Sequence, residues 1–165
     1  MKVVLLRGLS GSGKSTYANK LALETPNTVI CTADDYFMKD GVYKFDRNKL
    51  GEAHQACYQK FFVEITKGTD LIIVANTNTT TKELVNYVGI CEDAGVPFEI
   101  ITISCPLELA IQRNIHSVPK KTIVRQYDNL IRAKFPSNWA HKTIEAVESK
   151  TVLDFDNDPE YKGFV

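Results

Sequence analysis

Gly8-Leu9-Ser10-Gly11-Ser12-Gly13-Lys14-Ser15 is the stretch that decides the fold of this chain. It follows an apolar run at residues 3–6 and has the pattern G-x-x-x-x-G-K-[ST] in the order strand, glycine-rich loop, helix. Glycines let the backbone of such a loop turn so that successive N–H groups point toward one anion. The following helix directs the positive end of its dipole at the same point. The stretch therefore predicts a binding site for the phosphates of a nucleotide.

The residues of this loop have separate expected roles. Lys14 is expected to reach the β and γ phosphates of a nucleotide, and the Ser15 hydroxyl is expected to ligate the Mg²⁺ that bridges them. The alternative is a glycine-rich turn that only joins a strand to a helix, but the complete eight-residue pattern in this context argues against it. The residues expected to hold the nucleotide are Gly8, Leu9, Ser10, Gly11, Ser12, Gly13, Lys14, Ser15 and Thr16.

Length and charge limit the organisation of the chain and its partners. A chain of 165 residues suits one domain with a well-buried core, and we expect residues 1–165 to form it. Because 20 basic residues balance 20 acidic ones, no overall field attracts nucleic acid from a distance. A polyanionic partner would need a local basic patch. Residues 112–142 are one candidate, with seven basic residues against the single Asp128.

The cysteines and the N-terminus predict a cytoplasmic setting. The four cysteines are irregularly spaced and form no C-x-x-C pair, which argues against a disulfide framework and a zinc site. We interpret them as buried thiols of a reducing compartment. The apolar run at the N-terminus is too short for a signal peptide or a membrane-spanning helix, so no membrane partner is expected.

Strands and helices alternate along the chain. Strands are expected at residues 2–7, 28–32, 70–75 and 98–103, and helices at 14–24, 46–67, 81–94, from Pro106 to about residue 112, and 120–133. A hairpin is expected at 36–45 around Asp40-Gly41, and a last strand at 151–155. In the helix at 46–67, the expected buried stripe is Leu50, Ala53, Cys57, Phe61 and Ile65. This alternation predicts a parallel sheet with right-handed crossovers.

Asp34 and Asp35 follow the second expected strand, at the sheet edge where ligands bind in α/β folds. One of them is a candidate general base, which would accept the proton of an acceptor hydroxyl. The alternative is a turn or a helix cap, a common use of an isolated Asp pair. Their position relative to the phosphate loop favours the catalytic interpretation.

Arg113 is expected in a lid over about residues 112–134. An arginine at a helix end before a loop can neutralise charge on a transferring phosphoryl group, because its planar fork matches phosphate oxygens. A surface arginine stabilised by the helix dipole is an equally good interpretation. His116, Lys120, Lys121 and Arg125 are weaker candidates for the same lid, and a solvated basic face explains the two lysines equally well.

Two polar and two aromatic residues further along have open roles. Asn76 and Asn78 follow the third expected strand, where many nucleotide enzymes carry an acid that helps to hold Mg²⁺. Metal binding would then depend on Ser15, on the phosphates and on Asp34 through water.

Phe135 and Trp139 could stack on a base, but we favour a role in anchoring the C-terminal segment, 135–165, on the core.

Several motifs together resemble one kinase family. They are residues 6–16, Asp34-Asp35-Tyr36-Phe37, Asn76-Thr77-Asn78 and Arg113-Asn114 followed by Val118-Pro119. The sequence from residue 1 to about 132 resembles P-loop kinases of the polynucleotide 5′-hydroxyl kinase-like group. That group includes the phage-type enzymes and related kinase-like ATPase domains of animal proteins. The resemblance implies an α/β P-loop NTPase fold, a three-layer sandwich with a mostly parallel central sheet and a helical lid.

The resemblance also implies roles and departures. It implies Asp34 as general base on a 5′-hydroxyl and Arg113 as a lid arginine on the nucleotide phosphates. Polynucleotide kinases commonly carry an arginine three residues after the base, where this chain has Phe37, and a second lid arginine where it has Ser117. We expect ATP- and Mg²⁺-dependent phosphorylation of nucleic acid 5′ ends. The alternatives are a small-molecule acceptor, such as a nucleotide, nucleoside or sugar, and an ATP-binding regulatory module.

Overall fold

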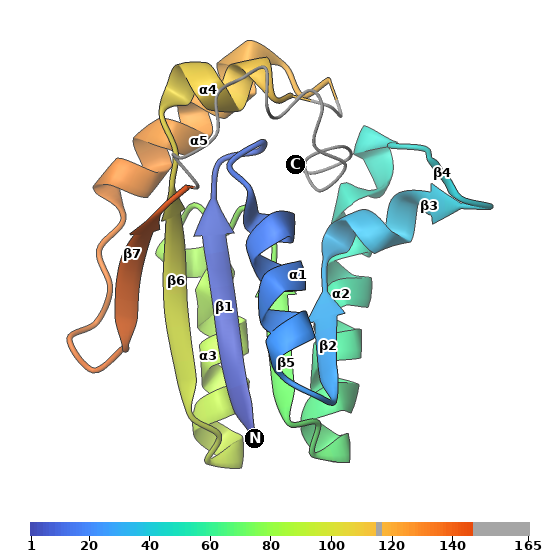
Figure 1. Cartoon of the computed structure of the whole chain (residues 1–165), viewed down its shortest axis with the longest axis vertical. Helices are drawn as coiled ribbons and strands as arrows, with labels where there is room; N and C mark the ends of the chain where they lie inside the picture. Colours follow the sequence, from blue (N-terminus) through green and yellow to red (C-terminus); the bar gives the residue numbers. More distant parts are fainter. Residues whose placement is uncertain (115–116, 147–165) are drawn as a thin grey trace.

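A five-stranded parallel sheet forms the centre of the computed structural model, which describes residues 1–114 and 117–146 (Figure 1). The strand order is β2-β5-β1-β6-β7, so β1 with its phosphate loop lies in the middle. Its two neighbours, β5 and β6, pair with it in parallel along most of its length. The strand bounds are β1 (Lys2–Gly8), β2 (Thr28–Cys31), β5 (Leu71–Ala75), β6 (Phe98–Ser104) and β7 (His141–Glu145).

Helices cover both faces of this sheet. Figure 1 shows α1 in front of the strands and α2 and α3 behind them. Alternate residues of β1 enter two separate cores, as a strand buried on both faces requires. Val3 and Leu5 pack with α2 and α3, whereas Val4 and Leu6 pack with α1, α4 and α5. The predicted three-layer α/β fold is confirmed. The helix bounds are α1 (Lys14–Glu24), α2 (Leu50–Lys67), α3 (Thr81–Ala94), α4 (Leu107–Gln112) and α5 (Lys120–Arg132).

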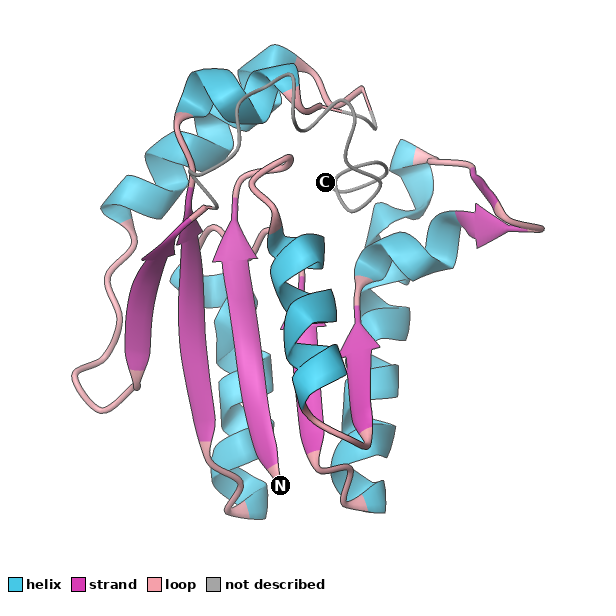
Figure 2. Ribbon diagram, in the orientation of Figure 1, coloured by secondary structure: helices cyan, strands magenta, loops and turns pink. Residues whose placement is uncertain are grey.

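A small hairpin projects beside the sheet, between β2 and α2 (Figure 2). It consists of β3 (Met38–Lys39) and β4 (Val42–Tyr43), with the 3₁₀ helices η1 (Ala33–Phe37) before it and η2 (Arg47–Lys49) after it. Asp40 and Gly41 both have positive φ, as a two-residue type I′ turn requires. The hairpin predicted from Asp40-Gly41 is therefore present, and it begins directly after η1, the helix that carries Asp34 and Asp35.

The remaining differences from the sequence prediction lie at element ends and at one sheet edge. Asp46 caps η2 by accepting a hydrogen bond from the Asn48 N–H (3.0 Å), and α2 begins only at Leu50, whose side chain is 40% exposed. The expected buried stripe therefore starts at Ala53. The sequence analysis missed β7, because most of its residues are exposed and no apolar run marks it. The strand expected at 151–155 lies outside the described residues.

Buried thiols and aromatic side chains complete the core. All four cysteines are buried and free. Trp139 is buried in the core on the α2 and α3 side, and Phe135 stacks on it while the Arg7 guanidinium lies 4.9 Å from the Phe135 ring centroid. These contacts support the anchoring role of Phe135 and Trp139. Within the described part of the chain, the helices are too short or too polar to span a bilayer.

Candidate functional site

Three glycines shape the loop between β1 and α1. Gly11 and Gly13 have φ of 80° and 96°, which L side chains rarely adopt. A Cβ on Gly11 would lie 2.6 Å from the Ala110 carbonyl oxygen, and one on Gly8 would lie 2.8 Å from Ser12 Oγ. The glycines thus allow the loop to curl tightly against α4, with its backbone turned around one point.

Lys14 is a buried cation at the centre of this loop. Its side chain is 3% exposed, and its ammonium group donates to the carbonyl oxygens of Gly8 (3.1 Å) and Leu9 (2.7 Å). Burial lowers the pKa of Lys14 from 10.5 to about 8, and the nearby Asp34 carboxylate partly opposes this effect. Lys14 and Asp34, which lie 20 residues apart in the sequence, therefore interact electrostatically in the fold.

Two buried hydroxyls beside Lys14 have no hydrogen-bond partner among the described residues. They are Ser12 Oγ and Thr16 Oγ1. Buried polar groups in folded proteins are nearly always hydrogen-bonded, so such a pair indicates a place for an acceptor from outside the chain. Phosphate oxygens are acceptors, and the buried Lys14 ammonium favours an anion. The residues at the loop therefore fit the phosphates of a nucleotide.

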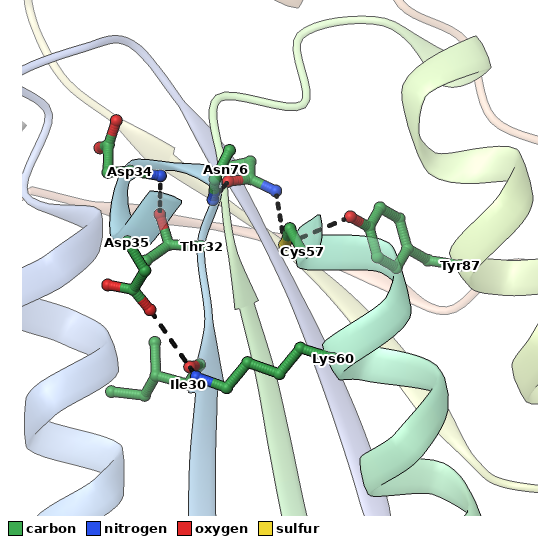
Figure 3. Close-up of polar contacts among 9 residues, drawn as sticks. Ile30, Thr32, Asp34, Asp35, Cys57, Lys60, Asn76 and Tyr87 are labelled. Atoms are coloured by element: carbon green, nitrogen blue, oxygen red, sulfur yellow. Dashed lines mark hydrogen bonds and ion pairs between the residues drawn. The ribbon is translucent and has the colours of Figure 1, made fainter. Parts of the chain in front are cut away.

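The two neighbouring aspartates point in different directions (Figure 3). Asp35 turns toward α2 and lies 3.7 Å from the Lys60 ammonium. Asp34 accepts a hydrogen bond from the Tyr43 hydroxyl (3.2 Å), and burial together with the Asp34 carboxylate raises the pKa of Tyr43. The Thr32 hydroxyl caps η1 by accepting from the Asp34 N–H. Of the two aspartates, Asp34 is the one whose charge acts on Lys14, so the structure distinguishes two residues that their position after the strand left open.

A cavity of about 320 Å³ lies next to the loop. Ser15, Thr32 and Asp35 line it, together with apolar residues of α1 and β2. Hydroxyl and carboxylate oxygens are the ligand atoms that Mg²⁺ prefers. The donor set therefore fits a divalent cation at Ser15, with Asp35 rather than Asp34 on the same wall.

Arg113 lies at the C-terminal end of α4, directly over the phosphate loop. A Cβ on Gly13 would lie 3.8 Å from Arg113 Nη1, and one on Gly11 would lie 3.4 Å from Arg113 Cβ. Burial raises the pKa of the Cys105 thiol, and the nearby Arg113 and Lys14 cations partly oppose this effect. Arg113 thus joins Lys14 at the loop. Three of the other lid candidates, Lys120, Lys121 and Arg125, are exposed on α5, and His116 lies outside the described residues.

The sequence of residues 3–122 matches the family described as AAA domain. The chain belongs to the AAA domain family. Human NEDD4-binding protein 2 is a curated relative, 38% identical over an alignment of 141 positions that covers 79% of this chain. The chain spans only 8% of the length of that relative.

Solved structures share the fold of this AAA domain. A chain of the Pnkp1/Rnl/Hen1 RNA repair complex matches with a TM-score of 0.64 and 21% identity, over 79% of this chain and 44% of that one. A gluconokinase from Sinorhizobium meliloti 1021 matches with a TM-score of 0.58 and 13% identity, over 89% of this chain and 83% of that one. These likenesses concern the fold, and they agree with the P-loop fold expected from the sequence.

Gln126 is a residue of the AAA domain site that sequence analysis missed. Its amide oxygen accepts from the Ser10 N–H (3.0 Å), and its amide nitrogen donates to Ser10 Oγ (3.2 Å). This double contact joins α5 to the phosphate loop across 116 residues of sequence. No local pattern marks such a glutamine, because its role depends only on where the helix packs.

Asn76 positions the segment that carries Asp34. Its side-chain oxygen accepts from the Ala33 N–H at the start of η1 (2.9 Å), and its amide nitrogen donates to Cys57 Sγ, which also accepts from the Tyr87 hydroxyl (Figure 3). Asn78 donates to the Leu6 carbonyl oxygen (2.9 Å). In the AAA domain these two asparagines are thus part of the scaffold at the sheet edge. The sequence analysis assigned them no structural role and noted only that they stand where many nucleotide enzymes carry an acid for Mg²⁺.

Proposed function

We propose that this chain transfers the terminal phosphoryl group of ATP to the 5′-hydroxyl of a polynucleotide end. The observation that carries the proposal is the pairing of a buried, pKa-lowered Lys14 with Asp34, which follow β1 and β2 at the carboxyl edge of one parallel sheet. A cation for the donor phosphates and a base for the acceptor hydroxyl are what phosphoryl transfer requires from a protein.

The residues of the site have complementary roles in this reaction. Lys14 and the backbone of residues 8–16 hold the phosphates, and the Ser12 and Thr16 hydroxyls donate to phosphate oxygens. The oxygen of the acceptor hydroxyl bonds to the γ-phosphorus while Asp34 accepts the proton of that hydroxyl. The bond from the γ-phosphorus to the bridging oxygen breaks, and ADP leaves. Arg113 neutralises charge on the transferring group. Mg²⁺ at Ser15 would neutralise further phosphate charge when bound.

A small-molecule acceptor is the second candidate, and one observation favours it. Phe37 is 2% exposed and lies in the core, so the position three residues after Asp34 offers no cation to an acceptor phosphate. The family resemblance leads us to expect an arginine there. The structural likeness includes a gluconokinase as well as an RNA repair complex, and it supports the fold alone.

Incubation with γ-labelled ATP, Mg²⁺ and a panel of acceptors tests the proposal. The panel contains 5′-hydroxyl oligonucleotides of DNA and RNA, 5′-phosphorylated oligonucleotides as matched controls, nucleosides and sugars. We expect label only on the 5′-hydroxyl oligonucleotides. Label on small molecules alone would establish the second candidate, and tight ATP binding without any labelled acceptor would indicate a regulatory module.

We also propose a compartment for the protein and bounds for its domain. Four free, buried thiols are consistent with the reducing cytoplasm. We further propose that residues 1–165 act as one domain in which residues 112–134, which include α5, serve as the lid over the phosphate loop.

A further inference from the structure

The burial of Phe37 leaves the acceptor without its expected cation, yet cations gather close by. A cavity of about 430 Å³ lies in the segment from η1 through the hairpin to η2. Its wall includes Lys39, Lys44, Phe45, Arg47 and Lys49, which we call the basic pocket. Nothing in the phosphate-loop site uses these residues.

The charge of the basic pocket is largely uncompensated. Its four cations are exposed, and none forms an ion pair with another described residue. Asp46 also lines the cavity, but its carboxylate is engaged as the cap of η2 through the Asn48 N–H. Four cations around one cavity raise the local concentration of an anionic ligand. Phosphate is the anion to consider, because the acceptor proposed for the neighbouring site is a polynucleotide.

Phe45 adds an aromatic face to this cavity. Its side chain is 50% exposed, although its ring packs against Phe37 (5.1 Å between centroids) and stacks on Tyr43 (6.4 Å, 13° between planes). The ring is therefore held from behind while one side remains open. A fixed, exposed aromatic ring among cations is the usual platform for the bases of single-stranded nucleic acid.

The basic pocket is physically connected to the candidate base. Tyr43, which stacks on Phe45, donates its hydroxyl hydrogen bond to Asp34. Tyr36 and Phe37, which also line the cavity, belong to η1, the helix that carries Asp34. A strand whose 5′-hydroxyl meets Asp34 would thus continue toward the basic pocket.

We propose that the basic pocket binds the acceptor strand, a single-stranded nucleic acid, beyond its 5′-terminal nucleotide. Lys39, Lys44, Arg47 and Lys49 hold backbone phosphates, and a base stacks on Phe45. This inference rests on the proposed function for its biological meaning, but the binding itself does not require turnover. The pocket replaces the arginine whose position Phe37 occupies.

Fluorescence anisotropy with a 5′-hydroxyl 12-mer tests the pocket, using the full chain and its charge-reversal variant Lys44→Glu/Arg47→Glu. Both side chains are exposed, so folding should be retained. Each lost phosphate contact removes about 0.7 from the slope of log affinity against log salt, so we expect the slope to flatten by about 1.4. At low salt the dissociation constant should rise at least about tenfold. The matched control Lys20→Glu/Lys82→Glu changes charge equally on exposed faces of α1 and α3, and should bind nearly as the wild type does.

Phe45→Leu tests the stacking separately, because it keeps an apolar contact with Phe37 but removes the aromatic face. We expect weaker binding by about fivefold or more, as for the loss of one base–aromatic stack. The proposal would be overturned if the wild type and the charge-reversal variant bound the 12-mer equally well. It would also be overturned if the wild type bound no oligonucleotide, or if it bound a mononucleotide as tightly as the 12-mer. Turnover is measured in parallel. Pocket-dependent binding without turnover would leave the pocket standing and refute the kinase, whereas turnover unaffected by charge reversal would refute only the pocket.

Discussion

Lys14→Met should change how the stability of the protein depends on pH. In the folded chain, burial places the pKa of Lys14 at about 8, whereas in the unfolded chain it returns to the ordinary value of 10.5. Between these values the unfolded chain binds more protons than the folded one, so the stability of the wild type rises with pH. A methionine fills similar volume and does not titrate, so this contribution is absent from the variant.

The magnitude follows from the difference between the two pKa values. At about 1.4 kcal/mol for each pH unit, a fall from 10.5 to about 8 corresponds to about 3 kcal/mol over the whole range. Because Lys14 is almost fully buried, solvent screening takes little from this value. By pH 10, the free energy of unfolding of the wild type relative to Lys14→Met should have risen by about 2–3 kcal/mol from its value at pH 7.

Urea unfolding of both proteins at half-unit steps from pH 7 to pH 10 measures this difference. Other groups, including the buried Arg7 whose pKa is about 10, titrate in both proteins and cancel. Lys20→Met, at an exposed position of α1, controls for the loss of an ordinary surface lysine. A difference that stays constant within about 0.5 kcal/mol across this range would show that Lys14 is not a buried cation, and the argument from its burial would fail.

Three further predictions concern residues around the loop. Asp34→Asn should lower the turnover number on an accepted substrate by at least about 100-fold while leaving the ATP dissociation constant unchanged, and unaltered turnover would remove Asp34 from the role of base. Asn76→Ala should lower the free energy of unfolding by about 1–3 kcal/mol in urea titrations, because the buried Ala33 N–H loses its acceptor; a change below about 0.5 kcal/mol would contradict this. Gln126→Ala should speed amide hydrogen exchange of Ser10 by about fivefold, the equivalent of one hydrogen bond worth about 1 kcal/mol, and unchanged protection would mean that the contact is absent in solution.

The donor side of the site could be predicted from sequence because its geometry is local. Positive φ at Gly11 and Gly13, a strand before them and a helix after them are all encoded within about fifteen residues. The same holds for the hairpin, where two consecutive turn residues suffice, and for α3, where Thr80 and Glu83 form a capping box. Such features need no knowledge of distant contacts.

The remaining features depend on contacts that no local pattern encodes. The choice between Asp34 and Asp35 depends on Lys60 of α2 and on Tyr43 of the hairpin, which draw the two carboxylates apart. Gln126 contacts Ser10 only because α5 packs beside β1. β7 is an edge strand with an exposed, polar sequence, so it pairs with β6 without the apolar run that marks the inner strands.

The hairpin contacts both the candidate base and the basic pocket, so its residues can affect which acceptor is bound. One of its residues, Tyr43, contacts the candidate base, while its neighbours Lys44 and Phe45 line the basic pocket. The phosphate loop is a separate segment of the chain, between β1 and α1. Substitutions in residues 39–49 can therefore change the accepted ligand without disturbing the buried Lys14. The presence of Phe37 in place of an arginine is explained equally well by an acceptor site that lies in the basic pocket and by the absence of a polynucleotide site. The affinity of the protein for oligonucleotides decides between these two explanations.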